Sequence, residues 1–525
     1  MKFNYLDVVI YNRAELASRL SFSNHAYTNK ELLIRGYQVW GESLFNKING
    51  DFAFSFYDNE NNILYAARDA LGVKALYYVV SGEKYYFSHN IDTLFILSGI
   101  EKKPNLKSMK ALLHHRAVEY EDTMYEGIYR IPQGHYLKVT KDESQLCRYW
   151  YPETIETDYG ITLDEASVQF CVLFEKAIID RIGNDGETAY ELSGGLDSSS
   201  IVSMLKKKYP QKEIDTYSMC FDGLKCDELV YINSIEEKYS FRTRKISSQN
   251  IDYKNKFDFK FNYKMNPHWP ITTTFTMMFP MIEKMHRDEK KIIITGHGGD
   301  HLLTGSCMIL GNLLQRREFG KLFKELKSVK YPIYDIPRCI LFPIINLKVK
   351  KIFRKKSKLT DLFQVDNIDS SLTRFNINML ASPMQSLIMD GNALHTLENI
   401  YNVEFRHPFY DKNLIEFVLS LPPEYLYSKG WIKMLLRYSM EDILPNEIRS
   451  RGDKANFTEI IFQQLNGIDY RKILLKSNLV SLGLIEQKEI DRLIYLLENK
   501  NYKELLFLWT IVNLEYWYTI ILSQK

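Results

Sequence analysis

Residues 190–200 constrain this chain most, because their sequence, Y-E-L-S-G-G-L-D-S-S-S, places a glycine turn between a strand and a helix. Residues 188–192 predict the end of a buried strand, and 200–208 predict the start of a helix. Unpaired N–H groups and the helix dipole make such a turn an anion site, where glycine lets a phosphate approach the backbone. The residues expected to bind phosphate are Ser193, Gly194, Gly195, Ser198 and Ser199.

A carboxylate, Asp197, stands in the middle of this turn, and the Gly-Lys-Ser/Thr of a Walker A loop is absent. An acid beside a polyphosphate is tolerable when a divalent cation separates them, and Mg²⁺ commonly binds through one or two carboxylates plus phosphate oxygens. The turn therefore predicts a Mg·ATP site that grips the departing pyrophosphate and leaves the α-phosphorus open. The alternative is a serine-capped glycine turn without a ligand, which the number of specified residues disfavours.

A second glycine-rich turn, T-G-H-G-G-D-H-L-L-T-G at 295–305, follows a predicted strand at 291–295. Other predicted strands alternate with helices, which favours a parallel sheet that binds ligands beyond the carboxyl ends of its strands. Those strands are 188–192, 216–221 and 242–246, and the helices are 163–181 and 227–239.

In such a sheet the two turns lie side by side, so we expect Asp197 and Asp300 to share Mg²⁺. The alternative for Asp300 is a helix cap. His297 is a candidate to bond a substrate amine or accept its proton, or else a loop histidine without a catalytic role. The glycines of this turn expected beside the nucleotide are Gly296, Gly298 and Gly299.

The composition is that of a soluble globular chain of two or more domains, with 525 residues, 45% hydrophobic and 25% charged. A net charge of +3 is too mild to indicate nucleic-acid binding. Six cysteines without metal-ligand spacing, no secretion signal and no apolar run long enough for a bilayer favour a cytoplasmic protein.

The sequence S-G-G-L-D-S-S resembles the pyrophosphate loop of the asparagine synthetase superfamily, whose members adenylate a carboxylate and pass it to an amine. The resemblance implies an α/β fold, with an ATP-pyrophosphatase domain of parallel sheet and helical lobe at 160–525. It implies that Asp300 is the second Mg²⁺ ligand, and that Lys454, in R-G-D-K-A-N-F-T, offsets acyl-adenylate charge. It also brings Glu404, which precedes F-R-H-P-F-Y-D, near the substrate as a candidate catalytic acid or base.

Gly-His-Gly-Gly-Asp followed by His301 resembles most the lasso peptide cyclases. That likeness implies closure of a macrolactam between an Asp or Glu side chain of a precursor peptide and its N-terminal amine, with a leader-binding protein and a leader peptidase as partners. Two alternatives stay open. One is a ligase of the asparagine synthetase or β-lactam synthetase type that uses ammonia or a small amino-acid analogue, and the other is a non-catalytic binding scaffold.

Residues 1–150 predict short strands and turns, with a hairpin at 51–57 and 63–67, strands at 75–80 and 84–88, and a helix at 30–40. The segments I-N-G-D-F-A-F and A-R-D-A-L-G-V-K-A-L-Y-Y resemble a class II glutaminase domain of the α+β, N-terminal-nucleophile type. The family's nucleophilic cysteine follows the initiator methionine, where this sequence has Lys2, and no cysteine precedes Cys147. Glutamine hydrolysis then has no covalent route, so we expect a degenerate scaffold domain, unless the natural start lies upstream.

Three further expectations concern the rest of the chain. The Pro-punctuated segment 266–274 is a candidate substrate wall. The basic stretch 315–358 is either a lid or a pair of solvated amphipathic helices. The last third reads as all-helical, with a helix expected at 431–437 and long helices at 469–488 and 489–521.

Overall fold

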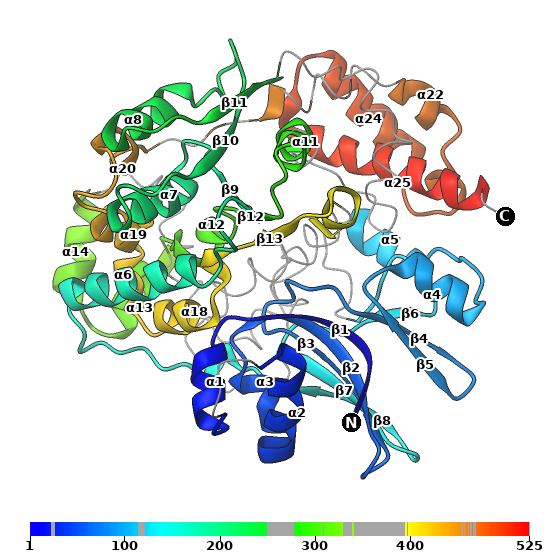
Figure 1. Ribbon diagram of the computed structural model, residues 1–525. Coiled ribbons are helices and arrows are strands. Elements are labelled where there is room, and N and C mark those ends of the chain that lie inside the picture. The colour runs from blue at the N-terminus through cyan, green and yellow to red at the C-terminus, as the bar shows by residue number, and fades with distance from the viewer. Residues whose placement is uncertain are drawn as a thin grey trace.

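The computed structural model describes residues 1–22, 27–113, 121–248, 278–307, 309–328, 339–340, 394–395, 397–452, 455, 457–459, 461, 465 and 469–523. The expected substrate wall at 266–274, Lys454 and most of the basic stretch 315–358 lie outside these residues. Figure 1 shows a β-rich N-terminal part below, a parallel sheet with its helices above and to the left, and the C-terminal helices above and to the right.

The N-terminal part forms two antiparallel sheets. In sheet order, the first contains β1 (Lys2–Ile10), β2 (Gly50–Asp58), β3 (Ile63–Arg68), β7 (His135–Val139) and β8 (Ser144–Arg148), and the second β5 (Lys84–Ser88), β4 (Tyr77–Ser81) and β6 (Ile128–Arg130). The predicted hairpin is confirmed as β2 and β3. Its alternating pattern separates two cores, because Phe54 packs against the helical side while Ala53 packs against Leu76 and the second sheet.

Among the residues that the structure describes, five α-helices accompany these sheets. They are α1 (Arg13–Arg19), α2 (Asn29–Trp40), α3 (Leu44–Lys47), α4 (Ile91–Ser98) and α5 (Leu106–Leu113). The predicted helix at 30–40 is confirmed as α2, which begins at a capping box formed by Thr28 and Glu31. The N-terminal part is therefore an α+β domain, as expected.

A separate parallel sheet follows the N-terminal domain and contains five strands in the order β11-β10-β9-β12-β13. They are β9 (Thr188–Glu191), β10 (Asp215–Cys220), β11 (Arg244–Ser247), β12 (Ile292–Ile294) and β13 (Glu404–Arg406). Its helices include α6 (Leu163–Ile179), α7 (Leu196–Lys208), α8 (Leu229–Tyr239), α11 (Phe279–Arg287) and α12 (Gly299–Leu303). Four strands were predicted. The edge strand β13 was missed, because three residues with two charges carry no strand pattern.

Helix α7 begins at Leu196, whereas the sequence predicted a start near Ser200. Gly195, in an extended conformation, is its N-cap, so the helix takes in part of the predicted turn. Asp197, Ser198 and Ser199 therefore lie in its first turn. The backbone N–H groups of Asp197 and Ser198 have no helical acceptor, whereas that of Ser199 donates to the Gly195 carbonyl at 3.2 Å.

The expectation of an all-helical last third is wrong. Helices dominate, namely α18 (Lys412–Leu419), α19 (Met434–Ser439), α20 (Asn446–Arg449), α22 (Tyr470–Leu475), α23 (Asn478–Ser481), α24 (Gln487–Glu498) and α25 (Leu505–Ser523). Three short strands also occur, β13, β14 (Tyr427–Ser428) and β15 (Trp431–Ile432). The long helix expected at 469–488 is broken at Ser477, which caps α23, and at Gly483, whose φ is +68°.

Helices α22 to α25 pack on the N-terminal domain. Trp509 and Trp517 of α25 share one apolar cluster with Leu112 of α5 and Tyr125, and Figure 1 places α25 beside α5. The C-terminal helices therefore pack against the first domain. The local sequence pattern did not predict this packing.

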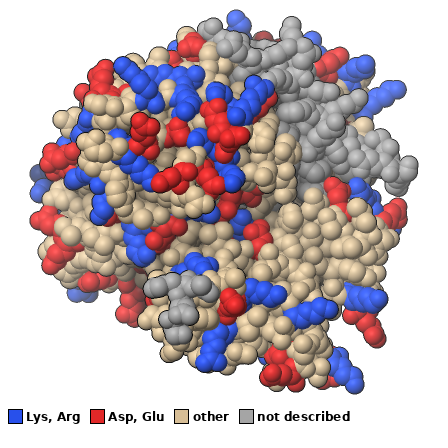
Figure 2. Space-filling view, viewed as in Figure 1, with Lys and Arg blue, Asp and Glu red and all other residues tan. Residues whose placement is uncertain are grey.

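The basic stretch begins at the last residue of α13 (Ile309–Gln315), and its described part contains α14 (Phe319–Ser328). In α14, Leu322 is buried while Phe319 and Phe323 are exposed. Over the face drawn in Figure 2, coloured basic and acidic side chains are interspersed. None of the described helices combines the length and apolarity that a bilayer span requires.

Candidate active site

The two glycine-rich turns meet at the carboxyl ends of β9 and β12, which are neighbours in the sheet. A Cβ atom on Gly296 would lie 2.7 Å from the backbone nitrogen of Ser198, and one on Gly299 would lie 2.4 Å from the carboxyl carbon of Asp197. Glycine is thus required for the close approach of the second turn to the first.

Asp197 and Asp300 converge on one cation, the ammonium of Lys433. Its Nζ lies 2.7 and 2.6 Å from the two carboxylate oxygens of Asp197 and 2.6 Å from Oδ1 of Asp300. Burial lowers the pKa of Lys433, but both carboxylates raise it and the net shift is upward. The two carboxylates thus hold a positive charge between them. Carboxylate oxygens together with phosphate oxygens are the ligands that suit Mg²⁺.

The sequence pattern assigns Lys433 to an amphipathic helix at 431–437 and does not mark it as a site residue. In the structure it has a left-handed φ of 58° and immediately precedes α19, while Trp431 and Ile432 form a strand. A lysine at a helix N-terminus opposes the helix dipole, and that is the signal that marks it. Arg437 and Arg451 lie on the same cavity wall.

A cavity of about 450 Å³ opens between these loops. Among the predicted site residues, its walls contain Ser193, Gly195, Asp197, Ser198, Gly296, His297 and Asp300. Its other walls are largely apolar, with Met219, Met278, Met281, Leu394 and Phe405. The cavity thus has two parts. The two glycine-rich turns form a polar end suited to phosphate, and the apolar residues form a chamber beside it.

Four predicted nucleotide-binding residues support the loops from behind the cavity wall. Gly194 has a φ of 79° and backs onto the carbonyl of Glu228, and Ser199 is fully buried in the first turn of α7. Gly298 has a φ of 97° and packs against Tyr410, and Gly299 abuts Asp197.

His297 of the second turn packs against His407, which follows β13. The ring of His297 lies 5.4 Å from the rings of both His407 and Tyr410, and His407 Nδ1 bonds Thr295 Oγ1 at 2.8 Å. Burial lowers the pKa of His297 to about 4 and holds the pKa of His407 well below its usual value. Both imidazoles are therefore neutral near pH 7, and can accept a hydrogen bond without adding charge.

The structure does not bring Glu404 into the cavity. Its carboxylate pairs with Arg406 at 3.0 Å, and Arg406 in turn donates to the carbonyl of Arg181. Phe405, which alternates with Glu404 along β13, is the residue on the cavity wall. Lys454 lies outside the described residues, although its neighbours Arg451 and Ala455 line the cavity.

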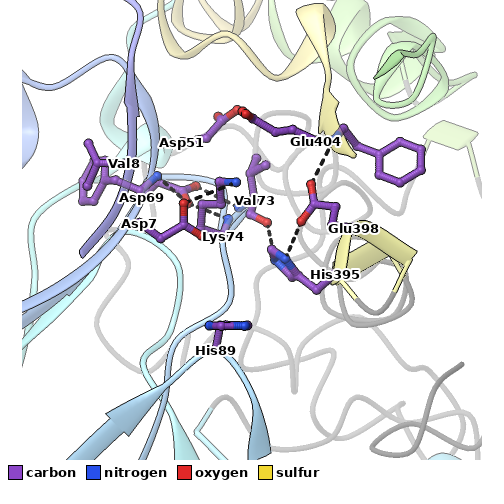
Figure 3. Close-up of polar contacts among 12 residues, drawn as sticks. Asp7, Val8, Asp51, Asp69, Val73, Lys74, His89, His395, Glu398 and Glu404 are labelled. Carbon is purple, nitrogen blue, oxygen red and sulfur yellow. Dashed lines mark hydrogen bonds and ion pairs between the residues drawn. The ribbon is translucent and has the colours of Figure 1, made fainter. Parts of the chain in front are cut away.

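A buried polar chain links the N-terminal domain to this wall (Figure 3). His395 Nε2 contacts the carbonyl of Val73 at 2.8 Å, and its Nδ1 lies 2.8 Å from Glu398. Glu398 also accepts from the backbone N–H of Phe405 at 2.9 Å. Burial raises the pKa of Glu398, but Lys74 and His395 lower it more, to about 2. Through this chain of contacts the first domain helps to position Phe405, which lines the cavity.

Comparison with known proteins agrees with both halves of this architecture. The asparagine synthase family matches residues 170–519, and the glutamine amidotransferase domain family matches residues 5–150. Asparagine synthetase [glutamine-hydrolyzing] 3 of Bacillus subtilis is 24% identical over 519 residues, which cover 92% of this chain and 80% of that protein. Amidase chry2 of Gibberella zeae is 23% identical over 546 residues, which cover 90% and 79%.

Proposed function

Because this chain belongs to the asparagine synthase family, whose members are ATP-dependent, AMP-forming carbon–nitrogen ligases, we propose that it closes a macrolactam in a precursor peptide. It adenylates an Asp or Glu side chain of the peptide, which then reacts with the peptide's own N-terminal amine. The carrying observation is the cavity, which joins a phosphate-type end with paired carboxylates to an apolar chamber. The apolar part of the cavity wall suits the apolar side chains of a peptide segment.

In the first half-reaction, a carboxylate oxygen of the peptide attacks the α-phosphorus of ATP, and the bond to the β-phosphate breaks. Ser193, Ser198 and the first turn of α7 supply donors for the leaving pyrophosphate. Lys433 adds positive charge beside it. Asp197 and Asp300 would hold Mg²⁺, which would neutralise phosphate charge there.

In the second half-reaction, the amine nitrogen attacks the acyl carbon, the bond to the AMP oxygen breaks, and the amine loses a proton. His297, neutral and on the cavity wall, is our candidate to accept it, and Lys454 our candidate to offset the charge of the tetrahedral intermediate. A folded peptide presents its own amine at high effective concentration. We place this chemistry in the cytoplasm, with a leader-binding protein and a leader peptidase as partners.

The test is a mass-spectrometric assay with a precursor peptide encoded beside the gene for this chain, presented with Mg·ATP. The expected result is a product lighter by one water, with equimolar AMP and pyrophosphate. Asp197→Ala is the matched control, expected to fold and to form no AMP. Amide formation only from aspartate and ammonium, or from a small analogue, would establish the alternative ligase. No AMP with any carboxylate would indicate a binding scaffold.

A further inference from the structure

Glu191 is an acidic residue of the cavity for which the mechanism above has no role. It is the last residue of β9, the central strand of the parallel sheet, and stands two positions before Ser193 of the phosphate turn. It lines the cavity and is partly accessible from it.

The sheet register shows which chamber Glu191 faces. In a strand, residues two apart share a face, so Glu191 lies on the same face as Ala189. It is also the register partner of Tyr217 on the parallel strand β10. Ala189 and Tyr217 pack in one apolar cluster with Met281 of α11. Glu191 therefore lies at the end of this apolar face, where the face borders the chamber.

Glu191 lacks the partners that other buried acids in this molecule have. Glu398 accepts from the Phe405 backbone and pairs with His395, and Glu236 pairs with Lys245. Among the residues that the structure describes, none pairs with the Glu191 carboxylate by a hydrogen bond or an ion pair, and burial raises its pKa to about 7. Placing a carboxyl group in an apolar chamber is costly unless a donor arrives to meet it.

We propose that Glu191 accepts a hydrogen bond from an N–H donor of the bound ligand and so selects ligands that carry an amino group at this point. Two positions along an extended strand span about 7 Å, so a ligand whose phosphates rest on Ser193 reaches Glu191. The amino group belongs either to the nucleotide base or to the amine substrate. This role rests on the proposed function, because it assigns the recognition of that reaction's own ligands.

Calorimetric titration of the full chain, together with steady-state kinetics on the peptide, separates the two sources. Wild type and Glu191→Leu are titrated with Mg·ATP and with the purine ribonucleoside triphosphate that lacks the 6-amino group. If the base is the donor, Glu191→Leu weakens ATP binding about tenfold or more, and the analogue binds both proteins equally weakly. If the amine substrate is the donor, ATP binding is unchanged and the KM for the peptide rises about tenfold. Glu213→Gln, at an exposed acid, is the matched control.

A thermal melt guards against a merely structural role. Because Glu191 has no partner among the described residues, Glu191→Leu is expected to melt at or above the wild-type temperature. Unchanged ATP affinity together with unchanged peptide KM overturns the assignment. If wild type binds ATP with the discrimination described but forms no amide, only the proposed reaction fails. If wild type does not bind ATP, both fail.

Discussion

Replacing Lys433 by methionine tests the central feature of the site, the convergence of two carboxylates on one cation. Lys433→Met keeps an unbranched side chain as far as the ε position and leaves Asp197 and Asp300 facing one another without the ammonium between them. Removing one partner of a buried ion pair costs about 3–5 kcal/mol. The Asp300 side chain is 39% exposed, so solvent screens its share and we expect about 3 kcal/mol at most.

The assay is thermal unfolding of the domain that carries the parallel sheet, with and without Mg²⁺, since this chain has more than one domain and a single transition is not assumed. Without Mg²⁺, Lys433→Met is expected to melt several degrees below wild type. Mg²⁺ at about 100 times its dissociation constant would return about 2.7 kcal/mol, by preferential binding to the folded state. Wild type, with the ammonium already in place, is expected to respond less.

The double variant Lys433→Met, Asp197→Asn supplies the matched control, because it removes the facing charges and with them the Mg²⁺ response. A Lys433→Met protein as stable as wild type and indifferent to Mg²⁺ would refute the reasoning. The same indifference in both variants would show that these carboxylates do not form a cation site.

Three further predictions follow from the same structure. Lys454→Ala is expected to lower the rate of AMP formation at least about a hundredfold, measured under saturating Mg·ATP, and a two- or threefold effect would return this lysine to a solvated role. Gly299→Ala is expected to abolish AMP formation, because its Cβ would fall 2.4 Å from the Asp197 carboxyl carbon, and retained activity in this variant would contradict the close approach of the turns. The folded-state pKa of Glu398, about 2, lies below its ordinary 4.5, so its contribution of about 3 kcal/mol is present above pH 4.5 and lost as pH falls toward 2. Urea unfolding at pH 6 and pH 3 captures about 2 kcal/mol of this loss, and Glu398→Gln should flatten the pH dependence.

Much of the fold was accessible from local patterns. Alternation predicted the β2–β3 hairpin, and four of the five parallel strands were predicted, although the segment that forms β11 carries no apolar run. The broken C-terminal helices and the packing of α25 on the first domain were not predicted. Periodicity reports which face of a helix is apolar, but it does not report which partner covers that face.

The sequence by itself determined the chemistry of the two turns, because glycine, serine and aspartate at fixed spacing between a strand and a helix are read locally. Only the tertiary structure decided that Lys433 lies between Asp197 and Asp300, since it reaches Asp197 from 236 positions away. It likewise turned Glu404 out of the cavity and left Glu191 within it. Strand order and side-chain face create these contacts, and both depend on how distant segments pack rather than on the residues beside each position.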